Sequence, residues 1–202
     1  MYRLVSALIA DQAVNGSRVL IAGAGGGREI EALGAAAKAL DITAVDPSNE
    51  GLSAAKRIAE RTGASDRINF FGGTMRELPS ALPFDFATSL LVMHNLGDDG
   101  AKSDYLSKLY RHLAPGGVLL HADVCCDGDA EIQALTPAYM ATARQAGVAA
   151  DVARIERDAV SRLPVISVAR TAELFAEAGF SLPREIFRSL WYRCWICTRP
   201  GP

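Results

Sequence analysis

Short apolar runs alternate with helical stretches along most of the chain. Apolar runs too short for a helix predict buried strands at residues 18–22, 42–45, 67–71, 84–93 and 118–124. Stretches between them are rich in Ala, Glu, Leu and Lys, and they predict helices over residues 28–40, 52–62 and 102–113. Strands that alternate with helices predict right-handed βαβ units, and therefore an α/β fold whose parallel sheet carries helices on both faces.

The pattern changes after residue 125. Residues 129–162 contain two helical stretches and no convincing strand, and a further helix is predicted over 172–178, where Gly179 ends it. Residues 185–198 are rich in aromatic and β-branched residues, which predicts two strands joined by a tight connection. We expect this pair to form an antiparallel hairpin at the edge of the sheet.

Size and charge exclude several classes of protein. The chain has 202 residues, half of them hydrophobic, which fits a single domain over residues 1–202. The net charge of −2 argues against nucleic-acid binding, and the arginines at 154, 157 and 162 alternate with acidic residues as on a solvated helix face. No apolar run is long enough to cross a membrane and no leader segment is apparent, so we expect a cytoplasmic protein with no membrane partner.

Four cysteines raise the question of a metal site. Cys194 and Cys197 have C-x-x-C spacing, but they lie in a predicted strand, where residues three apart face opposite sides of the sheet. With Cys125 and Cys126 they are better interpreted as buried, reduced thiols. We therefore predict no metal.

The strongest chemical signal is a glycine-rich turn after the first predicted strand. The sequence Gly23-Ala24-Gly25-Gly26-Gly27 lies between that strand and the next helix. Glycine lets the backbone turn tightly and approach a ligand closely, and the start of a helix offers free N–H groups. Its position after a strand makes this turn a candidate ligand-binding loop.

Asp46 ends the second strand, 23 residues after Gly23. In a nucleotide-binding βαβ unit a carboxylate at this position accepts hydrogen bonds from the ribose hydroxyls. The structural alternative is a carboxylate that caps the next helix, a role that Ser48 could also take.

Together with the glycine turn and Asp46, the stretch Leu113-Ala114-Pro115-Gly116-Gly117-Val118-Leu119 resembles the class I S-adenosylmethionine-dependent methyltransferases. The resemblance is clear over about residues 15–125. It implies a Rossmann-like, doubly wound, mostly parallel seven-stranded sheet with an antiparallel last strand and a helical lid insert at about 129–162. It also implies S-adenosyl-L-methionine as cofactor, bound by Gly23, Ala24, Gly25, Gly27, Asp46, Pro47, Thr74, Met75 and Leu91.

Two departures from the family pattern concern acidic residues. The family often has an acid where this chain has Ile21, and Gly-Asp after the third strand where this chain has Gly72-Gly73. Thr74 or Met75 could contact the adenine in place of the Asp that is missing here. These departures motivate an alternative, a non-catalytic cofactor-binding or scaffold protein of the same fold.

A nicotinamide-dependent reductase uses similar geometry. Dinucleotide binders prefer G-x-G-x-x-G, a pattern that lets a pyrophosphate lie at the start of the helix. Arg28 stands at the position of the third glycine here, which disfavours a dinucleotide.

The acceptor should bind where the fourth strand ends, because ligands bind at the carboxyl ends of parallel strands. His94 could accept a proton from the acceptor and Asn95 could hydrogen-bond it, although a locally packed histidine is the structural alternative. Leu96-Gly97 follows Asn95 in place of the Pro-Pro-Tyr found in the amino-methylating members of the family. This difference argues against N-methylation of adenine or glutamine. His121 and His112 are interpreted as structural.

The predicted insert at 129–162 could form a lid, with Ile132, Leu135, Tyr139 and Met140 on its inner face, or a helix packed on the sheet. We expect Tyr139 and Arg157 to contact the substrate. The insert is also similar to that of carboxymethyl-transferring tRNA-modifying members, in which a lid arginine holds a carboxylated cofactor; Arg157 is the nearest candidate.

The resulting hypothesis is a cofactor-dependent methyltransferase acting on a small-molecule acceptor. Transfer to a nucleophilic atom needs mainly alignment and desolvation, with help from His94. The apolar, aromatic tail suggests a surface for a homodimer.

Overall fold

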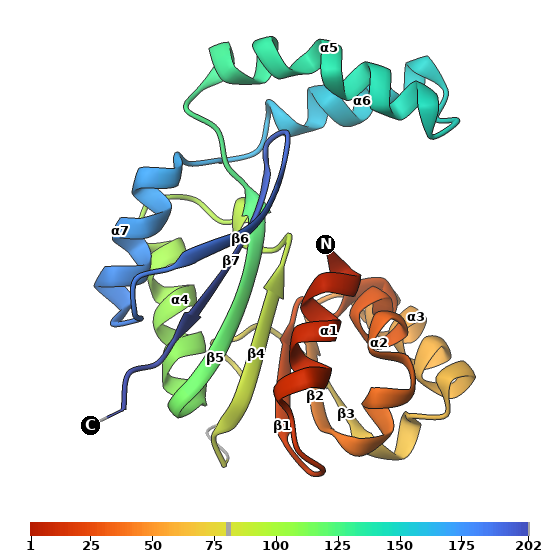
Figure 1. The fold of residues 1–202 in the computed structure, drawn as a ribbon, viewed down its shortest axis with the longest axis vertical. Coiled ribbons are helices and arrows are strands. Elements are labelled where there is room, and N and C mark those ends of the chain that lie inside the picture. Colours follow the sequence, from red (N-terminus) through yellow and green to blue (C-terminus); the bar gives the residue numbers. More distant parts are fainter. Residues whose placement is uncertain (80–81, 202) are drawn as a thin grey trace.

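The computed structural model describes residues 1–79 and 82–201, and a twisted seven-stranded sheet runs through it (Figure 1). The spatial order is β3-β2-β1-β4-β5-β7-β6. The strands span Arg18–Ala22 (β1), Asp41–Asp46 (β2), Ile68–Gly72 (β3), Phe84–Leu90 (β4), Leu113–Val124 (β5), Arg184–Ser189 (β6) and Tyr192–Thr198 (β7). β1 to β5 are parallel, and β7 is antiparallel to both β5 and β6. The predicted sheet, with its antiparallel last strand, is confirmed.

Helices cover both faces of the sheet (Figure 1). One face carries α1 (Tyr2–Gln12), α2 (Arg28–Leu33) and α3 (Asn49–Thr62), and the other carries α4 (Ala101–His112) and α7 (Val168–Ala178). The helical pair α5 (Asp129–Gln145) and α6 (Ala150–Val160) projects beyond the carboxyl ends of the parallel strands. Among the described residues, we find no helix with the length and apolar character needed to traverse a bilayer.

The apolar strands are buried on both faces, which explains why their sequences do not alternate. In β1, Val19 and Ile21 enter one core cluster with α1 to α3, while Leu20 and Ala22 enter the other with α4 and α7. Cys194 and Cys197 likewise fall in different clusters, as predicted from their spacing, and all four cysteines are free and buried.

Three element boundaries predicted from the sequence were wrong. The helix over 28–40 ends at Leu33, because Gly34 has a φ of 53° and the chain continues as 3₁₀ turns over Gly34–Ala39. The strand over 84–93 ends at Leu90, because Leu91 turns the chain with a φ of 61°. The Pro115-Gly116-Gly117 turn lies inside β5, which begins at Leu113. Helix α1 was not predicted.

Candidate active site at the carboxyl edge of the sheet

The glycine loop follows β1 at this edge, and two of its glycines are required by sterics. Gly23 has a φ of 82°, and a Cβ there would lie 2.2 Å from Cγ2 of Val92. Gly27 has a φ of 72°, and its Cβ would lie 2.9 Å from Cα of Ala55. At Gly26 a Cβ would meet nothing within 4 Å, so the backbone there faces open space. The loop is therefore packed against the protein on one side and accessible on the other.

Asp46 joins β2 to this loop. One carboxylate oxygen accepts a hydrogen bond from the Gly25 N–H at 2.8 Å, and the other accepts from the Ser48 N–H at 2.8 Å. Ser48 itself caps α3 by accepting from the Gly51 N–H at 3.0 Å. The capping role considered from the sequence thus falls to Ser48, while Asp46 fixes the loop. Its carboxylate is half-buried, and Pro47 beside it is exposed.

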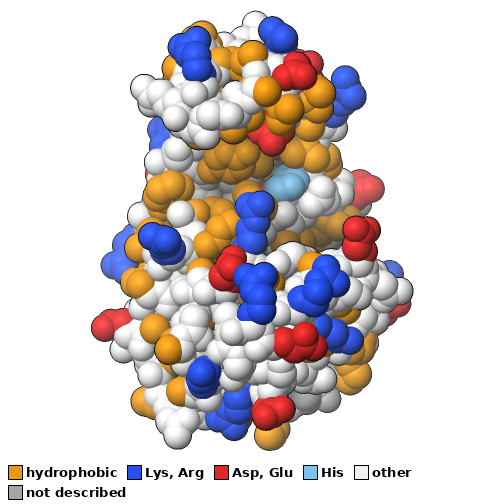
Figure 2. Space-filling view, turned by 90° about the vertical axis from the view of Figure 1, so that its right-hand side faces the viewer, with side chains coloured by type: hydrophobic (Ala, Val, Ile, Leu, Met, Phe, Trp, Pro, Cys, Tyr) orange, Lys and Arg blue, Asp and Glu red, His pale blue; other side chains and the backbone are white. Residues whose placement is uncertain are grey.

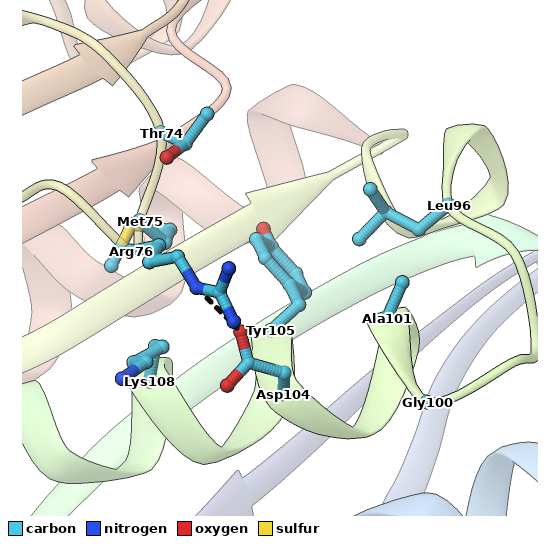
Figure 3. Close-up of a pocket in the computed structure, with 9 residues that line it drawn as sticks. All are labelled: Thr74, Met75, Arg76, Leu96, Gly100, Ala101, Asp104, Tyr105 and Lys108. Atoms are coloured by element: carbon cyan, nitrogen blue, oxygen red, sulfur yellow. Dashed lines mark ion pairs between the residues drawn. The ribbon is translucent and has the colours of Figure 1, made fainter.

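The segment after β3 forms one wall of a pocket of about 340 Å³ (Figure 3). Thr74 is engaged locally, since both its N–H and its hydroxyl donate to Glu77 at 2.8 Å, and these bonds lower the pKa of Glu77. Met75 packs into the core and borders the pocket. The opposite wall comes from α4, and Arg76 reaches across to Asp104 at 3.7 Å.

A buried carboxyl lies near the position where the family acid is missing. Ile21 pairs with Thr88 of β4, and the Glu29 side chain from α2 is buried beside Thr88. Burial raises the pKa of Glu29 to about 8, and the neighbouring Thr88 hydroxyl acts in the opposite direction. Within the part of the chain that the structure describes, one Glu29 oxygen and the Thr88 hydroxyl have no hydrogen-bond partner. A buried carboxyl from α2 therefore lies beside Thr88, the residue that pairs with Ile21.

His94 lies in the turn after β4 and is held by a carboxylate. Its Nδ1 hydrogen-bonds Oδ1 of Asp123, which is buried in β5 and also accepts from the Val124 N–H at 2.9 Å. Since an ionised carboxylate only accepts hydrogen bonds, Nδ1 carries the proton and Nε2 is the basic nitrogen. The His94 side chain is 12% exposed, so it is mostly desolvated but reachable. This is the geometry of a general base with an orienting carboxylate.

A second histidine lies behind this pair. His121 is fully buried, its Nδ1 is 3.2 Å from the Ser89 hydroxyl, and that hydroxyl is 2.8 Å from the hydroxyl of Tyr105. Its Nε2 is 3.9 Å from Asp123, too far for a hydrogen bond. Burial lowers the pKa of His121 to about 4, so the ring is neutral. His121 is therefore a core histidine, as the sequence suggested. It packs behind Asp123, the residue that holds His94.

Asn95 and Leu91 flank His94 in the turn. The Asn95 amide donates to the Val92 carbonyl at 3.2 Å, so in this conformation it closes its own turn. Leu91 packs against the apolar cluster under α5. Neither position contradicts the roles expected for these residues, which remain predictions.

The helical pair α5 and α6 lies above the carboxyl edge. Ile132 with Leu135 and Tyr139 packs on a cluster that includes Val124, Cys126, Leu91, Val160 and Trp191, whereas Met140 lies outside it. α5 therefore covers the edge and not the face of the sheet. Figure 2 shows hydrophobic side chains gathered at the hollowed waist between this helical pair and the rest of the molecule.

Tyr139 and Arg157 are both engaged with neighbours. The Tyr139 hydroxyl donates to Glu156 at 2.7 Å, its ring lies 5.0 Å from that of Trp191, and burial together with Glu156 raises its pKa to about 12. Arg157 pairs with the adjacent Asp158 at 2.8 Å. Their expected contacts with substrate remain predictions.

Sequence reasoning missed Asp123, Ser89 and Tyr105. A signal for Asp123 was present: it is the acidic residue near the end of an otherwise apolar strand, two residues after His121, at an edge where ligands bind. Ser89 and Tyr105 carried no such signal.

Comparison with known families gives a consistent result. A family model described as "Methyltransferase domain" matches residues 20–119. The Psychrobacter arcticus ubiquinone biosynthesis O-methyltransferase is 33% identical over 111 residues, which cover 54% of this chain and 41% of that protein. An uncharacterised Synechococcus protein is 32% identical over 162 residues, which cover 77% of this chain and 37% of the Synechococcus protein. The chain thus spans about two fifths of the length of these relatives.

Solved structures share the fold at low sequence identity. A putative O-methyltransferase from Nostoc punctiforme aligns over 98% of this chain and 55% of its own, with a TM-score of 0.73 and 18% identity. The Burkholderia thailandensis 1,6-didemethyltoxoflavin N1-methyltransferase, solved with S-adenosylhomocysteine, aligns over 99% of this chain and 78% of its own, with a TM-score of 0.67 and 21% identity. Residues 20–119 thus belong to the methyltransferase family that the model describes, and the described chain has the Rossmann-like fold of class I S-adenosylmethionine-dependent methyltransferases.

Proposed function

We propose that this chain transfers a methyl group from S-adenosyl-L-methionine to a hydroxyl oxygen of a small, largely apolar acceptor. The single observation that carries the choice of oxygen is the pair formed by His94 and Asp123 at the carboxyl edge. A hydroxyl must lose its proton as it is methylated, and a neutral imidazole oriented by a carboxylate is suited to accept that proton.

The residues of the edge fit the proposed cofactor. The accessible backbone around Gly25 and Gly26 can approach its methionine portion, and Asp46 is placed to accept hydrogen bonds from the ribose hydroxyls. Thr74 and Met75 border the pocket proposed for the side of the adenine. When bound, the cofactor supplies a methyl group attached to a positively charged sulfur.

The chain's own residues then account for the remaining steps. Tyr139 and the cluster under α5 exclude water and align the acceptor, which raises the effective concentration of the reacting atoms. Nε2 of His94 would accept the proton that the acceptor hydroxyl loses on methylation, and the cofactor, once bound, would supply the methyl group. Asp123 stabilises the imidazolium that results.

One relative supports an oxygen acceptor, since the Psychrobacter protein is named as an O-methyltransferase. The apolar cluster supports an acceptor with hydrophobic surface, and the acidic net charge disfavours tRNA. We propose that residues 1–202 form one functional domain, with α5 and α6 as its lid.

The first experiment is a calorimetric titration of the purified chain with S-adenosylmethionine, S-adenosylhomocysteine and NADH. Micromolar binding of the adenosyl compounds without NADH binding supports the cofactor assignment, and no adenosyl binding refutes it. A panel of phenols and other hydroxyl compounds is then screened for methyl transfer. Binding without transfer to any of them would favour the non-catalytic alternative.

His94→Ala tests the chemistry. Turnover is expected to fall about 100- to 10,000-fold, while the affinity for S-adenosylhomocysteine changes less than about twofold. His112→Ala, at the end of α4, is the matched control and should keep full activity. Unchanged turnover of the His94 variant would refute the assigned base.

A further inference from the structure

Lys102 is a lysine without access to solvent. It lies in the first turn of α4, its exposed fraction is 0%, and its side chain runs back toward the turn after β4. Its ammonium donates hydrogen bonds to the Met93 carbonyl at 2.9 Å and to the Leu96 carbonyl. Fully buried lysines are rare because burying the charge is costly, so this position requires an explanation.

Its two acceptors lie on either side of His94. The ammonium therefore ties together the two ends of the short turn that presents the imidazole to the edge of the sheet. Without these bonds two carbonyls would lose a charged donor, and the turn would be free to move relative to Asp123.

The charge of Lys102 also acts on Asp123. Burial lowers the pKa of Lys102, while the nearby carboxylates of Asp123, Asp98 and Asp99 favour its ammonium form. The charge of Lys102 is also felt at His121 behind Asp123. An ionised carboxylate beside an imidazole favours the protonated ring, which can accept no further proton. The buried cation of Lys102, which bonds the turn and interacts with Asp123 only through its charge, opposes that effect.

We propose that Lys102 is a positioning residue for His94: its ammonium holds the turn at 93–96 against Asp123, and its charge counters that of Asp123. The inference rests on the proposed function only where it calls His94 the base. The described geometry of the turn is independent of any acceptor.

The test uses NMR titration of the three histidine rings in the full chain, with the His94 signals assigned from His94→Ala. In Lys102→Met, His94 should become protonated at a higher pH than in the unsubstituted protein, because a like charge has been removed. Lys102→Arg, which keeps the cation, should restore most of the difference. Lys56→Met, which removes a surface lysine of α3, should leave the titration unchanged. An unchanged or lowered midpoint in Lys102→Met would overturn the proposal.

Should Lys102→Met fail to fold, the unsubstituted protein still provides a test. The Nζ signal of Lys102 should remain that of an ammonium throughout the pH range in which His94 titrates, and a neutral amine there would overturn the proposal. Neither the His94 titration nor the Lys102 Nζ signal requires a methyl acceptor. Failure of the proposed function, seen as no binding of S-adenosylhomocysteine, is therefore distinguishable from failure of this inference.

Discussion

The two halves of the carboxyl edge are built by different means. On the side of β1 and β2, the glycine loop is fixed by backbone groups and by one carboxylate, Asp46, that accepts from Gly25. On the side of β4 and β5, the edge depends on interactions of three side chains, those of His94, Lys102 and Asp123. The first half presents backbone to a ligand, and the second half presents a titratable group. Substitutions in the two halves should therefore separate binding from catalysis.

The largest expected effect is that of Asp123→Asn, in the side-chain half. An amide cannot hold His94 in the tautomer that leaves Nε2 basic and cannot stabilise the imidazolium, so turnover should fall about 1,000-fold or more. The affinity for S-adenosylhomocysteine, measured by calorimetry, should stay within about twofold.

Asp85→Asn is the matched control for Asp123→Asn. Asp85 lies in β4 at the opposite end of the sheet and accepts from the Arg18 N–H, so its amide variant should keep full turnover. Comparable losses of cofactor affinity and turnover in Asp123→Asn would mean that the two halves are not separable.

The same contrast explains what the sequence could predict. The apolar strands and the glycine turn after the first of them are local patterns, in which spacing and residue type determine the backbone, and their positions were predicted correctly. The cofactor contacts expected of the glycine loop and Asp46 stay predictions. Lys102 was not identified because a lysine in an amphipathic helix normally lies on the solvated face, and nothing local distinguishes a buried one. The end of β4 was misplaced because Leu91 adopts a positive φ that its side chain does not favour.

The second largest effect that we expect is on stability and concerns Glu29. This residue lies in the first turn of α2, directly after the glycine loop, and burial raises its pKa to about 8. Because this pKa is raised above the ordinary value of 4.5, the folded protein prefers the protonated carboxyl. Its stabilising contribution is complete below about pH 4.5 and is lost as the pH rises toward 8, by as much as about 1.4 kcal/mol per pH unit. Glu29→Gln, which stays neutral, should remove this slope.

Urea unfolding between pH 5 and pH 8.5 measures the effect of Glu29→Gln. The variant should be more stable than the unsubstituted protein at pH 8.5, and the difference should shrink toward pH 5. Glu31→Gln, two residues along the same helix and exposed, is the control. Parallel stability curves for the Glu29 variant and the unsubstituted protein would show that the buried carboxyl is not the source of the pH dependence.

The smallest effect we expect comes from Gly23→Ala, and it tests how far the backbone half depends on its packing. A methyl group at Gly23 would approach Cγ2 of Val92 to 2.2 Å and would also strain a φ of 82°. Gly26→Ala is a close control, because φ is 63° there and a Cβ meets nothing within 4 Å, so only the strain remains. We expect Gly23→Ala to lower the free energy of unfolding by about 2–3 kcal/mol and Gly26→Ala by about 1 kcal/mol. Since Val92 belongs to the turn that carries His94, the clash should also displace that turn, and Gly23→Ala should reduce turnover as well as stability. A Gly23 variant that loses stability but keeps full turnover would mean that the loop and the His94 turn move independently.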